Sequence, residues 1–315
     1  MWRMRGNAIS SSSLWRQSLR YLSSTSSASV PSCSHQVVSD GPSTSSRNET
    51  PPSTAGVLAS PSQKPNKKYR GSINDVETAK FAAIADTWWD HHGPFKPLHA
   101  INPVRLSFIR SALCHHFRKD ASSATPLDGL TIVDVGCGGG LACEPLARMG
   151  AQVLGVDAVE KNIKVASVHA MKDPSTSTIQ YRCTTAEQLV HENQEFDVVL
   201  ALEVIEHVAD HMEFCKSLAS LTKKNGMVII STINRSISAY GLAIVGAEYV
   251  LGWLPKGTHD WSKFVTPEEL ALLMKRTSLS IEEMAGVVFN PHTQKWSLSD
   301  DTSVNYIASS VRRVI

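Results

Sequence analysis

The chain has 315 residues, of which 42% are hydrophobic and 19% charged, so it can bury a large core. The net charge of +2 is too small to favour nucleic acid as a partner, and no basic stripe with interleaved aromatic residues occurs. No apolar run of about 18 residues or more is present, so no membrane-spanning helix is predicted. The six cysteines form no CxxC pair, which favours reduced thiols in an intracellular enzyme over a zinc or disulfide framework.

Residues 1–66 differ in composition from the rest of the chain. Arginine and bulky apolar residues recur near the start, serine is abundant, and no acidic residue occurs before Asp40. Such a start is typical of a mitochondrial transit peptide, and the Ser/Pro-rich stretch behind it is typical of an unstructured spacer. We therefore expect a transit peptide and spacer over 1–66 and one catalytic domain over 67–315. A disordered tail without a targeting role is the alternative.

Two helices are predicted ahead of the sheet. Acids at the start and apolar residues along one side predict a helix over 75–90. Its apolar side is marked by Val76, Ala79, Phe81, Ala83, Ile84 and Trp88. A second helix is predicted to begin at Asn102-Pro103, with Asn102 as its cap and Pro103 in its first turn.

From Thr131 onward, short β-branched runs alternate with helical stretches. Strands are predicted at 131–135, 152–156, 178–183, 196–200 and 227–232, and helices near 141–149, 162–171 and 212–222. This α/β order predicts a Rossmann-like, mostly parallel sheet flanked by helices. Two further strands, near 281–288 and 303–309, bring the count to seven and predict a C-terminal antiparallel hairpin around Pro291.

The first predicted strand runs into a glycine loop, Gly136-Cys137-Gly138-Gly139-Gly140. Glycines allow a sharp turn and a close approach of a ligand to the backbone. Ligands of parallel sheets bind at the carboxyl ends of the strands, where Asp157 can accept hydrogen bonds from a ribose. Position 141 is Leu, so the spacing is G-x-G-x-G and disfavours a dinucleotide. It favours S-adenosylmethionine; a non-catalytic turn, with Asp157 as a helix cap, is the alternative.

A second candidate site follows the fourth predicted strand. If the chain is helical here, Glu203, Glu206 and His207 lie at i, i+3 and i+4 on one side. Two carboxylates and an imidazole can bind Mg²⁺ or Mn²⁺, and the histidine leaves Zn²⁺ open. A cation there would lower the pKa of a coordinated hydroxyl. The alternatives are His207 as a general base without metal and a purely structural polar helix start.

Longer motifs surround these two sites and span about 72 to 306 in order. They are Ala79-Lys80-Phe81, Trp88-Trp89-Asp90, Phe95-Lys96-Pro97-Leu98-His99, Ile101-Asn102-Pro103-Val104-Arg105, Asp134–Gly140, Glu203–Val208, Ser231-Thr232-Ile233-Asn234-Arg235, Val245-Gly246-Ala247-Glu248-Tyr249, Pro255-Lys256-Gly257-Thr258-His259-Asp260 and Val304-Asn305-Tyr306. With them the chain resembles the ubiquinone-biosynthesis O-methyltransferases, a family within the seven-stranded S-adenosylmethionine-dependent methyltransferases.

The resemblance implies methylation of catechol-type hydroxyls on polyprenylated intermediates of coenzyme Q, 3,4-dihydroxy-5-polyprenylbenzoate and demethylubiquinol. Residues that would contact S-adenosylmethionine by matching position are Arg105, Gly136, Asp157 and Leu202. Residues that would bind the metal are Glu203, Glu206 and His207, with His207 also the catalytic candidate. Mg²⁺ is the expected ion, with Zn²⁺ or Mn²⁺ as alternatives. Another small-molecule methyltransferase and a non-catalytic scaffold of the same fold are the other functions considered.

An apolar segment, Ser236 to Pro255, follows the fifth predicted strand. A polyprenyl substrate resides in the bilayer, so this segment is a candidate for insertion at the interface, with Trp253 near the headgroups. A lid helix packed on the core is the alternative. His259 and Asp260 would line the acceptor pocket or form a turn network. The resemblance implies a peripheral location on the matrix face of the mitochondrial inner membrane and a coenzyme Q biosynthetic complex as partner.

Overall fold

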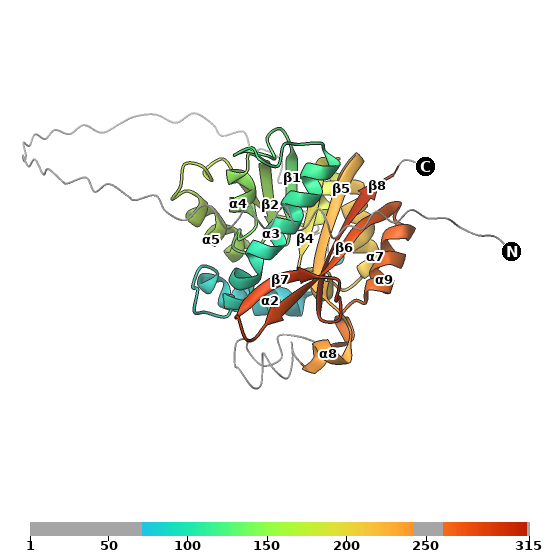
Figure 1. The fold of residues 1–315 in the computed structure, drawn as a ribbon. Coiled ribbons are helices and arrows are strands. Elements are labelled where there is room, and N and C mark those ends of the chain that lie inside the picture. The colour runs from blue at the N-terminus through green and yellow to red at the C-terminus, as the bar shows by residue number, and fades with distance from the viewer. Residues whose placement is uncertain (1–70, 242–260, 314–315) are drawn as a thin grey trace, which may run out of the picture. The chain divides into compact units, whose positions relative to one another are not determined.

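A computed structural model describes residues 71–241 and 261–313 (Figure 1). These residues form one mixed sheet of eight strands in the order β3-β2-β1-β4-β5-β8-β6-β7, flanked by helices. The predicted transit peptide and spacer lie outside the described residues, as do most of the apolar segment, His259 and Asp260. Of the helices described, none combines the length and apolar character that crossing a bilayer requires.

The parallel half of the sheet confirms the predicted strands. It consists of β1 (Thr131–Val135), β2 (Gln152–Asp157), β3 (Gln180–Cys183), β4 (Phe196–Leu202) and β5 (Thr222–Ile233). In register, Val135 pairs with Val156, and Leu202 pairs with Ser231. The carboxyl ends of β1, β2 and β4 therefore meet at one edge of the sheet, which is where a ligand site is expected.

The antiparallel half contains one strand more than the sequence predicted. Its strands are β6 (Leu279–Asn290), β7 (Lys295–Ser299) and β8 (Asn305–Arg312). The expected antiparallel pairing of β6 with β8 is confirmed, but the hairpin at Pro291 joins β6 to β7. The last strand inserts between β5 and β6. The short β7 was missed because Trp296 and Leu298 are its only large apolar residues.

Helices and 3₁₀ turns connect the strands. Before the sheet lie α2 (Asp75–Ile84), η1 (Ala85–Thr87) and α3 (Lys96–His116). Within the parallel half lie α4 (Cys143–Arg148), α5 (Glu160–Ala170), α6 (Ala186–His191), η2 (Ile205–His207) and α7 (His211–Leu221). After β5 come α8 (Ile237–Ala239), η4 (Trp261–Lys263) and α9 (Pro267–Arg276). Sequence analysis predicted neither α6 nor α9, although a Thr266/Glu269 capping box marks the start of α9.

The prediction for the start of α3 was wrong. The helix begins at Lys96, with Pro97 in its first turn, and Pro103 lies in its interior. Asn102 does not cap the helix, because its buried amide donates to the Leu141 carbonyl at 2.8 Å. A proline after a capping-type residue usually marks a helix start, but here the pair connects α3 to the segment that follows the glycine loop.

The predicted apolar side of the first helix is also only partly correct. Val76 is 65% exposed, whereas the acidic Glu77 is 6% exposed. Trp88 is buried as predicted, but it lies beyond the end of α2 and η1. Burial of a carboxylate on the core side of a helix requires a partner, and the site described below supplies it.

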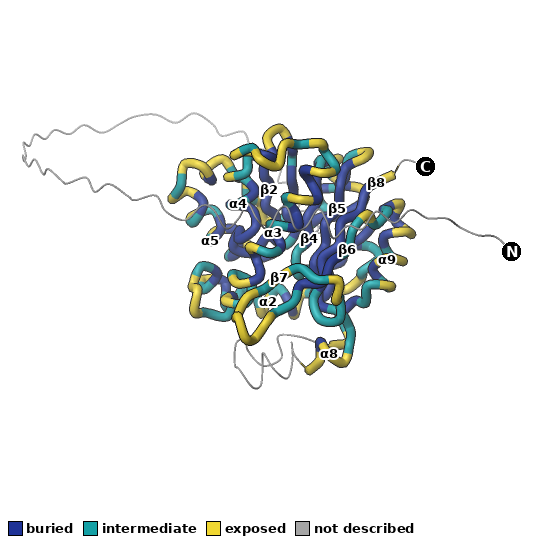
Figure 2. Tube along the Cα trace, viewed as in Figure 1, coloured by how far each residue is buried: buried dark blue, intermediate teal, exposed yellow. Residues whose placement is uncertain are grey.

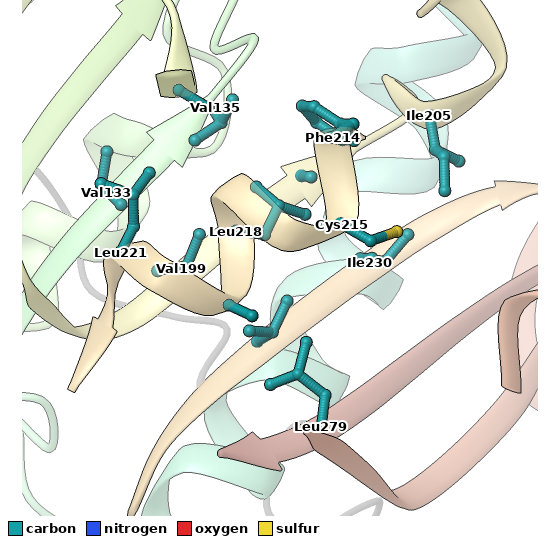
Figure 3. Packing of buried hydrophobic residues seen from close by; sticks show 14 of the residues in the cluster. Val133, Val135, Val199, Ile205, Phe214, Cys215, Leu218, Leu221, Ile230 and Leu279 are labelled. Carbon is teal, nitrogen blue, oxygen red and sulfur yellow. The ribbon is translucent and has the colours of Figure 1, made fainter. Parts of the chain in front are cut away.

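Both faces of the inner parallel strands β1, β2 and β4 and of the second half of β5 are buried, which explains their nearly continuous apolar sequences, whereas the edge strand β3 is largely exposed. Val133, Val199 and Ile230 pack with Phe214 and Leu218 of α7 (Figure 3). The residues that alternate with them along the strands are buried too, among them Ile132, Val198, Leu200 and Ile229. Figure 2 shows this burial concentrated along the strands and decreasing toward the connecting turns.

Tyr306 on β8 fastens the antiparallel strands to the chain ahead of α9. Its side chain is fully buried, and its hydroxyl donates to the Val265 carbonyl at 2.9 Å. The change Tyr306→Phe leaves that carbonyl without the hydroxyl, so we expect the free energy of unfolding to fall by about 1–2 kcal/mol. Urea denaturation measures this, with Tyr240→Phe at a half-exposed position as the control. Equal losses for both variants would contradict the expectation.

Candidate functional site

The glycine loop 136–140 follows β1 at the carboxyl edge of the sheet. Gly136 and Gly138 have φ values of 74° and 54°, in the region that residues with a Cβ rarely adopt. The loop is also closely covered by protein. A Cβ on Gly136 would lie 2.6 Å from the Val204 side chain, and one on Gly138 would overlap the Trp88 ring. The glycines are therefore required both by the backbone conformation and by the packing around the loop.

Asp157, the last residue of β2, is hydrogen-bonded to the glycine loop. One carboxylate oxygen accepts from the Gly138 N–H at 3.0 Å. The other accepts from the Val159 N–H at 2.8 Å and from the Asn162 amide at 3.2 Å. Burial raises the pKa of Asp157, while these hydrogen bonds act in the opposite direction. These bonds fix the orientation of the carboxylate at the end of β2, the place that the sequence predicted for Asp157.

Two consecutive tryptophans from the segment between η1 and α3 hold the glycine loop. Trp88 stacks on Phe95 with ring centroids 3.6 Å apart, and its indole N–H donates to the Asn162 Oδ1 at 2.9 Å. The indole N–H of Trp89 donates to the Gly139 carbonyl at 2.9 Å. Asn162 therefore connects Trp88 to Asp157. The sequence motif containing these tryptophans was noted, but their contact with the loop was not predicted.

A cavity of about 810 Å³ opens at this edge of the sheet. Its volume lies within the range of small-molecule sites. The strand ends contribute Val135, Gly136, Gly138, Asp157, Leu202 and Glu203 to its lining, and the next turn contributes Glu206 and His207. The structure thus brings six of the seven predicted site residues to one cavity.

Arg105 is the predicted site residue that does not line this cavity. It is 3% exposed on α3, with its guanidinium 3.7 Å from the Glu203 carboxylate and bonded to the Asn102 side chain at 3.1 Å. Among the described residues, its Nε has no hydrogen-bond partner. Burial lowers the pKa of Arg105, and the nearby carboxylates of Glu203 and Asp134 raise it.

The acidic–histidine cluster does not have the predicted helical arrangement. β4 extends to Leu202, and Glu203 continues its pairing through an N–H donated to the Ser231 carbonyl at 2.9 Å. Glu203 then adopts a φ of 56°, and only the short turn η2 follows. Glu203, Glu206 and His207 therefore do not share one side of a helix, because the strand pairing with β5 continues into the position where the helix was expected to begin.

Each of the three side chains has its own partner. The Glu203 carboxylate accepts from the Ser231 hydroxyl at 2.6 Å, and the Glu206 carboxylate accepts from the Thr232 hydroxyl at 2.8 Å. In residues 71–241 and 261–313, no three His, Cys, Asp or Glu side chains are placed to hold a metal ion together. As placed, the cluster does not fit a three-ligand cation site.

His207 pairs instead with Glu77, a residue that sequence reasoning missed. The His207 Nδ1 lies 3.0 Å from the Glu77 carboxylate, which also accepts from Lys263 Nζ at 3.2 Å. The hydrogen bond with His207 lowers the pKa of Glu77 to about 2. The only signal in the sequence was an acid on the core side of a predicted helix.

The pKa values of the other two titratable groups of the cluster, Glu206 and His207, are both raised. Burial and the nearby Glu203 carboxylate raise the pKa of Glu206 to about 7. Burial lowers the pKa of His207, but the hydrogen bond with Glu77 and the carboxylates of Glu206 and Glu203 outweigh it and raise the pKa. Two titratable groups that line the cavity, Glu206 and His207, therefore both have raised pKa values, as is common at functional sites.

Comparison with known proteins shows what this arrangement is similar to. A methyltransferase domain family matches residues 133–230. The mitochondrial ubiquinone biosynthesis O-methyltransferase of Arabidopsis thaliana is 63% identical over 242 residues, covering 77% of this chain and 75% of the relative. The ubiquinone biosynthesis O-methyltransferase of Parvibaculum lavamentivorans is 51% identical over 247 residues, covering 78% of this chain and 97% of the relative.

Among solved structures, the magnesium protoporphyrin IX methyltransferase of Synechocystis PCC 6803 with bound SAM has a similar fold. Its TM-score is 0.50 at 19% identity, covering 76% of this chain and 99% of that chain. At this level of identity the similarity supports the methyltransferase fold alone, and it agrees with the predicted Rossmann-like sheet.

Asp134, on β1 beneath the loop, provides a pH test of this buried region. Burial raises its pKa to about 6, although a hydrogen bond from the Cys143 thiol at 3.3 Å and the charge of Arg105 act oppositely. The folded state thus prefers the protonated acid, and stability is lost as pH rises from about 4 to 6. Asp134→Asn cannot ionise, so we expect its stability relative to wild type to increase over that window, by up to about 3 kcal/mol.

Urea unfolding at several pH values between 4 and 7 measures this difference. Asp173→Asn is the control, because hydrogen bonds from Ser175 lower the pKa of this half-exposed acid, so its stability relative to wild type should stay nearly constant over this pH range. A difference between Asp134→Asn and wild type that does not change with pH would contradict the expectation.

Proposed function

The chain belongs to the family of ubiquinone biosynthesis O-methyltransferases, and on this premise we propose how its residues hold the methyl donor and activate the acceptor. It is an S-adenosylmethionine-dependent O-methyltransferase. The proposal depends on one observation above all: the glycine loop, Asp157 and the Glu206–His207 turn line the same cavity.

We place S-adenosylmethionine at the carboxyl ends of β1, β2 and β4, against Gly136, Asp157 and Leu202. A carboxylate fixed by backbone N–H groups can accept hydrogen bonds from both ribose hydroxyls. Leu202 offers an apolar side chain and a backbone at the cavity wall. Arg105 lies behind this wall next to Glu203, and its buried Nε has no hydrogen-bond partner within the described part of the chain, which supports an interaction of its guanidinium with the donor.

We propose His207 as the general base. Glu77 accepts a hydrogen bond from the Nδ1–H, which leaves the Nε2 lone pair free for a hydroxyl of the acceptor. A phenol has an ordinary pKa of about 10, so proton removal strengthens it as a nucleophile at neutral pH. The proton passes to His207, the phenolic oxygen attacks the sulfonium methyl group, and the carbon–sulfur bond breaks to release S-adenosylhomocysteine. Positioning of the two reactants contributes to the rate.

A divalent cation remains a prediction. Mg²⁺, or Mn²⁺ or Zn²⁺ in its place, would bind Glu203, Glu206 and His207 and favour the ionised form of a catechol. At present the two carboxylates accept from the Ser231 and Thr232 hydroxyls and His207 Nδ1 pairs with Glu77, so the three side chains would have to turn toward a common ion.

The proposed acceptors are 3,4-dihydroxy-5-polyprenylbenzoate and demethylubiquinol, which carry catechol-type hydroxyls and a polyprenyl tail. The Arabidopsis relative is named mitochondrial, which supports a mitochondrial location for this chain. We further propose peripheral attachment to the matrix face of the inner membrane through the apolar segment 236–255, and association with a coenzyme Q biosynthetic complex. The arginine-rich start of the sequence supports import into the mitochondrion.

The donor site is tested by Asp157→Asn. Loss of the carboxylate removes acceptors for ribose hydroxyls, so we expect the Kd for S-adenosylmethionine to rise on the order of 10- to 100-fold. Isothermal titration calorimetry measures it. Asp173→Asn, at a half-exposed acid between α5 and β3, should bind as wild type does. Unchanged affinity in Asp157→Asn would remove this residue from the donor site.

The reaction is tested with a short-chain 3,4-dihydroxy-5-prenylbenzoate, with and without Mg²⁺, by mass spectrometry of the product. His207→Ala should lower kcat roughly 10²- to 10⁴-fold, and the exposed His92→Ala should not. Loss of activity in EDTA, restored by Mg²⁺ and abolished in Glu203→Ala/Glu206→Ala, would support the cation. Full activity in EDTA would contradict the cation, and absence of methylated product in every condition would contradict the proposed acceptor.

Membrane attachment is tested by flotation with vesicles of phosphatidylcholine and cardiolipin. The proposal predicts that Leu251→Ser/Trp253→Ser reduces the floating fraction severalfold, since it removes apolar anchoring groups. Val168→Ser/Met171→Ser removes two exposed apolar residues, one on α5 and one directly after it, and should float as wild type does. Equal flotation of both variants and wild type would count against the segment as an anchor.

A further inference from the structure

One wall of the cavity is formed by the β6–β7 hairpin, which turns at the predicted position near Pro291 but whose second strand, β7, was not predicted. The register pairs Phe289 with Trp296 and Val287 with Leu298. Because side chains alternate between the two faces of a strand, these four apolar residues project from one face of the hairpin. Val287, Phe289 and Trp296 line the cavity, and the rings of Phe289 and Trp296 lie 5.3 Å apart.

The helices ahead of the sheet add a second apolar surface to the same cavity. α2 contributes Phe81 and Ile84, and α3 contributes Leu98 and Ile101. α3 contacts both β6 and β7, so the two surfaces are adjacent, and Figure 1 shows β7 near one end of α3. Apart from the indole N–H of Trp296, none of the side chains named for these two surfaces carries a polar atom. This part of the cavity therefore suits a hydrocarbon.

The apolar surface begins beside the proposed general base. The rings of Phe81 and His207 are in edge-to-face contact, with their centroids 5.1 Å apart. Among the polar residues of the cavity, Asp157, Glu203 and Glu206 lie at or just beyond the ends of β2 and β4, and others lie on α2 and ahead of β8, such as Glu77 and Ser303. At the other limit, β7 is the edge strand of the sheet. The cavity thus passes from a polar region suited to the donor and the hydroxyls, along apolar side chains, to the periphery of the molecule.

We propose that the hairpin face of Val287, Phe289 and Trp296, together with Phe81 and Leu98, binds the isoprenoid tail of the acceptor and so selects prenylated catechols over tail-less ones. The inference rests on the proposed function and specifies where the tail lies. An isoprene unit is purely hydrocarbon, and burying one increases affinity by a factor on the order of 10 to 100. A tail longer than the cavity leaves along the edge strand.

The test compares acceptors with the same dihydroxybenzoate headgroup and zero, one or three isoprene units. For wild type, we expect kcat/KM to increase with each unit. In Trp296→Ser and Phe289→Ser, kcat/KM for the prenylated acceptors should fall about 10-fold or more, while that for the tail-less acceptor stays within about twofold. Trp296→Phe should retain most of the selectivity, and Leu272→Ser, on the exposed side of α9, all of it.

Calorimetry with S-adenosylmethionine and near-ultraviolet circular dichroism establish that each variant is folded and binds the donor. If a serine variant is unfolded, Trp296→Gln or Leu98→Ser replaces it in the same comparison. Equal kcat/KM for all three acceptors with wild type, or equal losses for prenylated and tail-less acceptors in the variants, would overturn the tail site. Absence of turnover with every acceptor would instead overturn the proposed function.

Discussion

The hydrogen bond from the Gly138 N–H to the Asp157 carboxylate joins the ends of β1 and β2, and the geometry of the site depends on it. The loop can adopt this position because its glycines leave room for Trp88 on one side and Val204 on the other. Trp88 in turn orients Asn162, whose amide completes the bonding of Asp157. The segment before α3 and the strand ends thus form a single unit, although they are far apart in the sequence.

The site also contains several buried charged side chains, and burying a charge without a partner is energetically unfavourable. Arg105, Asp134 and Glu206 are nearly inaccessible, and each is stable there only because of hydrogen bonds and opposite charges around it. Removing one partner of such a set leaves another buried charge uncompensated. Burial and the neighbouring charges shift the pKa values of these groups, so a cation, a proton or a ligand that enters the cavity would change the balance.

The parallel half of the fold was readable from sequence, whereas parts of the site were not. The strand 131–135 was predicted with its observed bounds because a β-branched run buried on both faces has few alternatives. Glu77 was missed because its partner His207 lies 130 residues away, and no local pattern reports such a contact. The position of Glu203 was misjudged because pairing with β5 overrode local helix preference. Pro103 was misread since a tertiary contact of Asn102 replaced its expected role as a cap.

The place of β8 in the sheet has a consequence for synthesis of the chain. This strand lies between β5 and β6, although both precede it. On the ribosome, β5 and β6 therefore expose unpaired backbone edges until residues 305–312 emerge, and such edges readily pair with other chains. The β6–β7 hairpin can form on its own, but β8 is the strand that joins it to the parallel half of the sheet. The sheet of a nascent chain is therefore complete only after β8 has joined it. Until then, the exposed strand edges make the chain a substrate for chaperones that bind unfolded proteins.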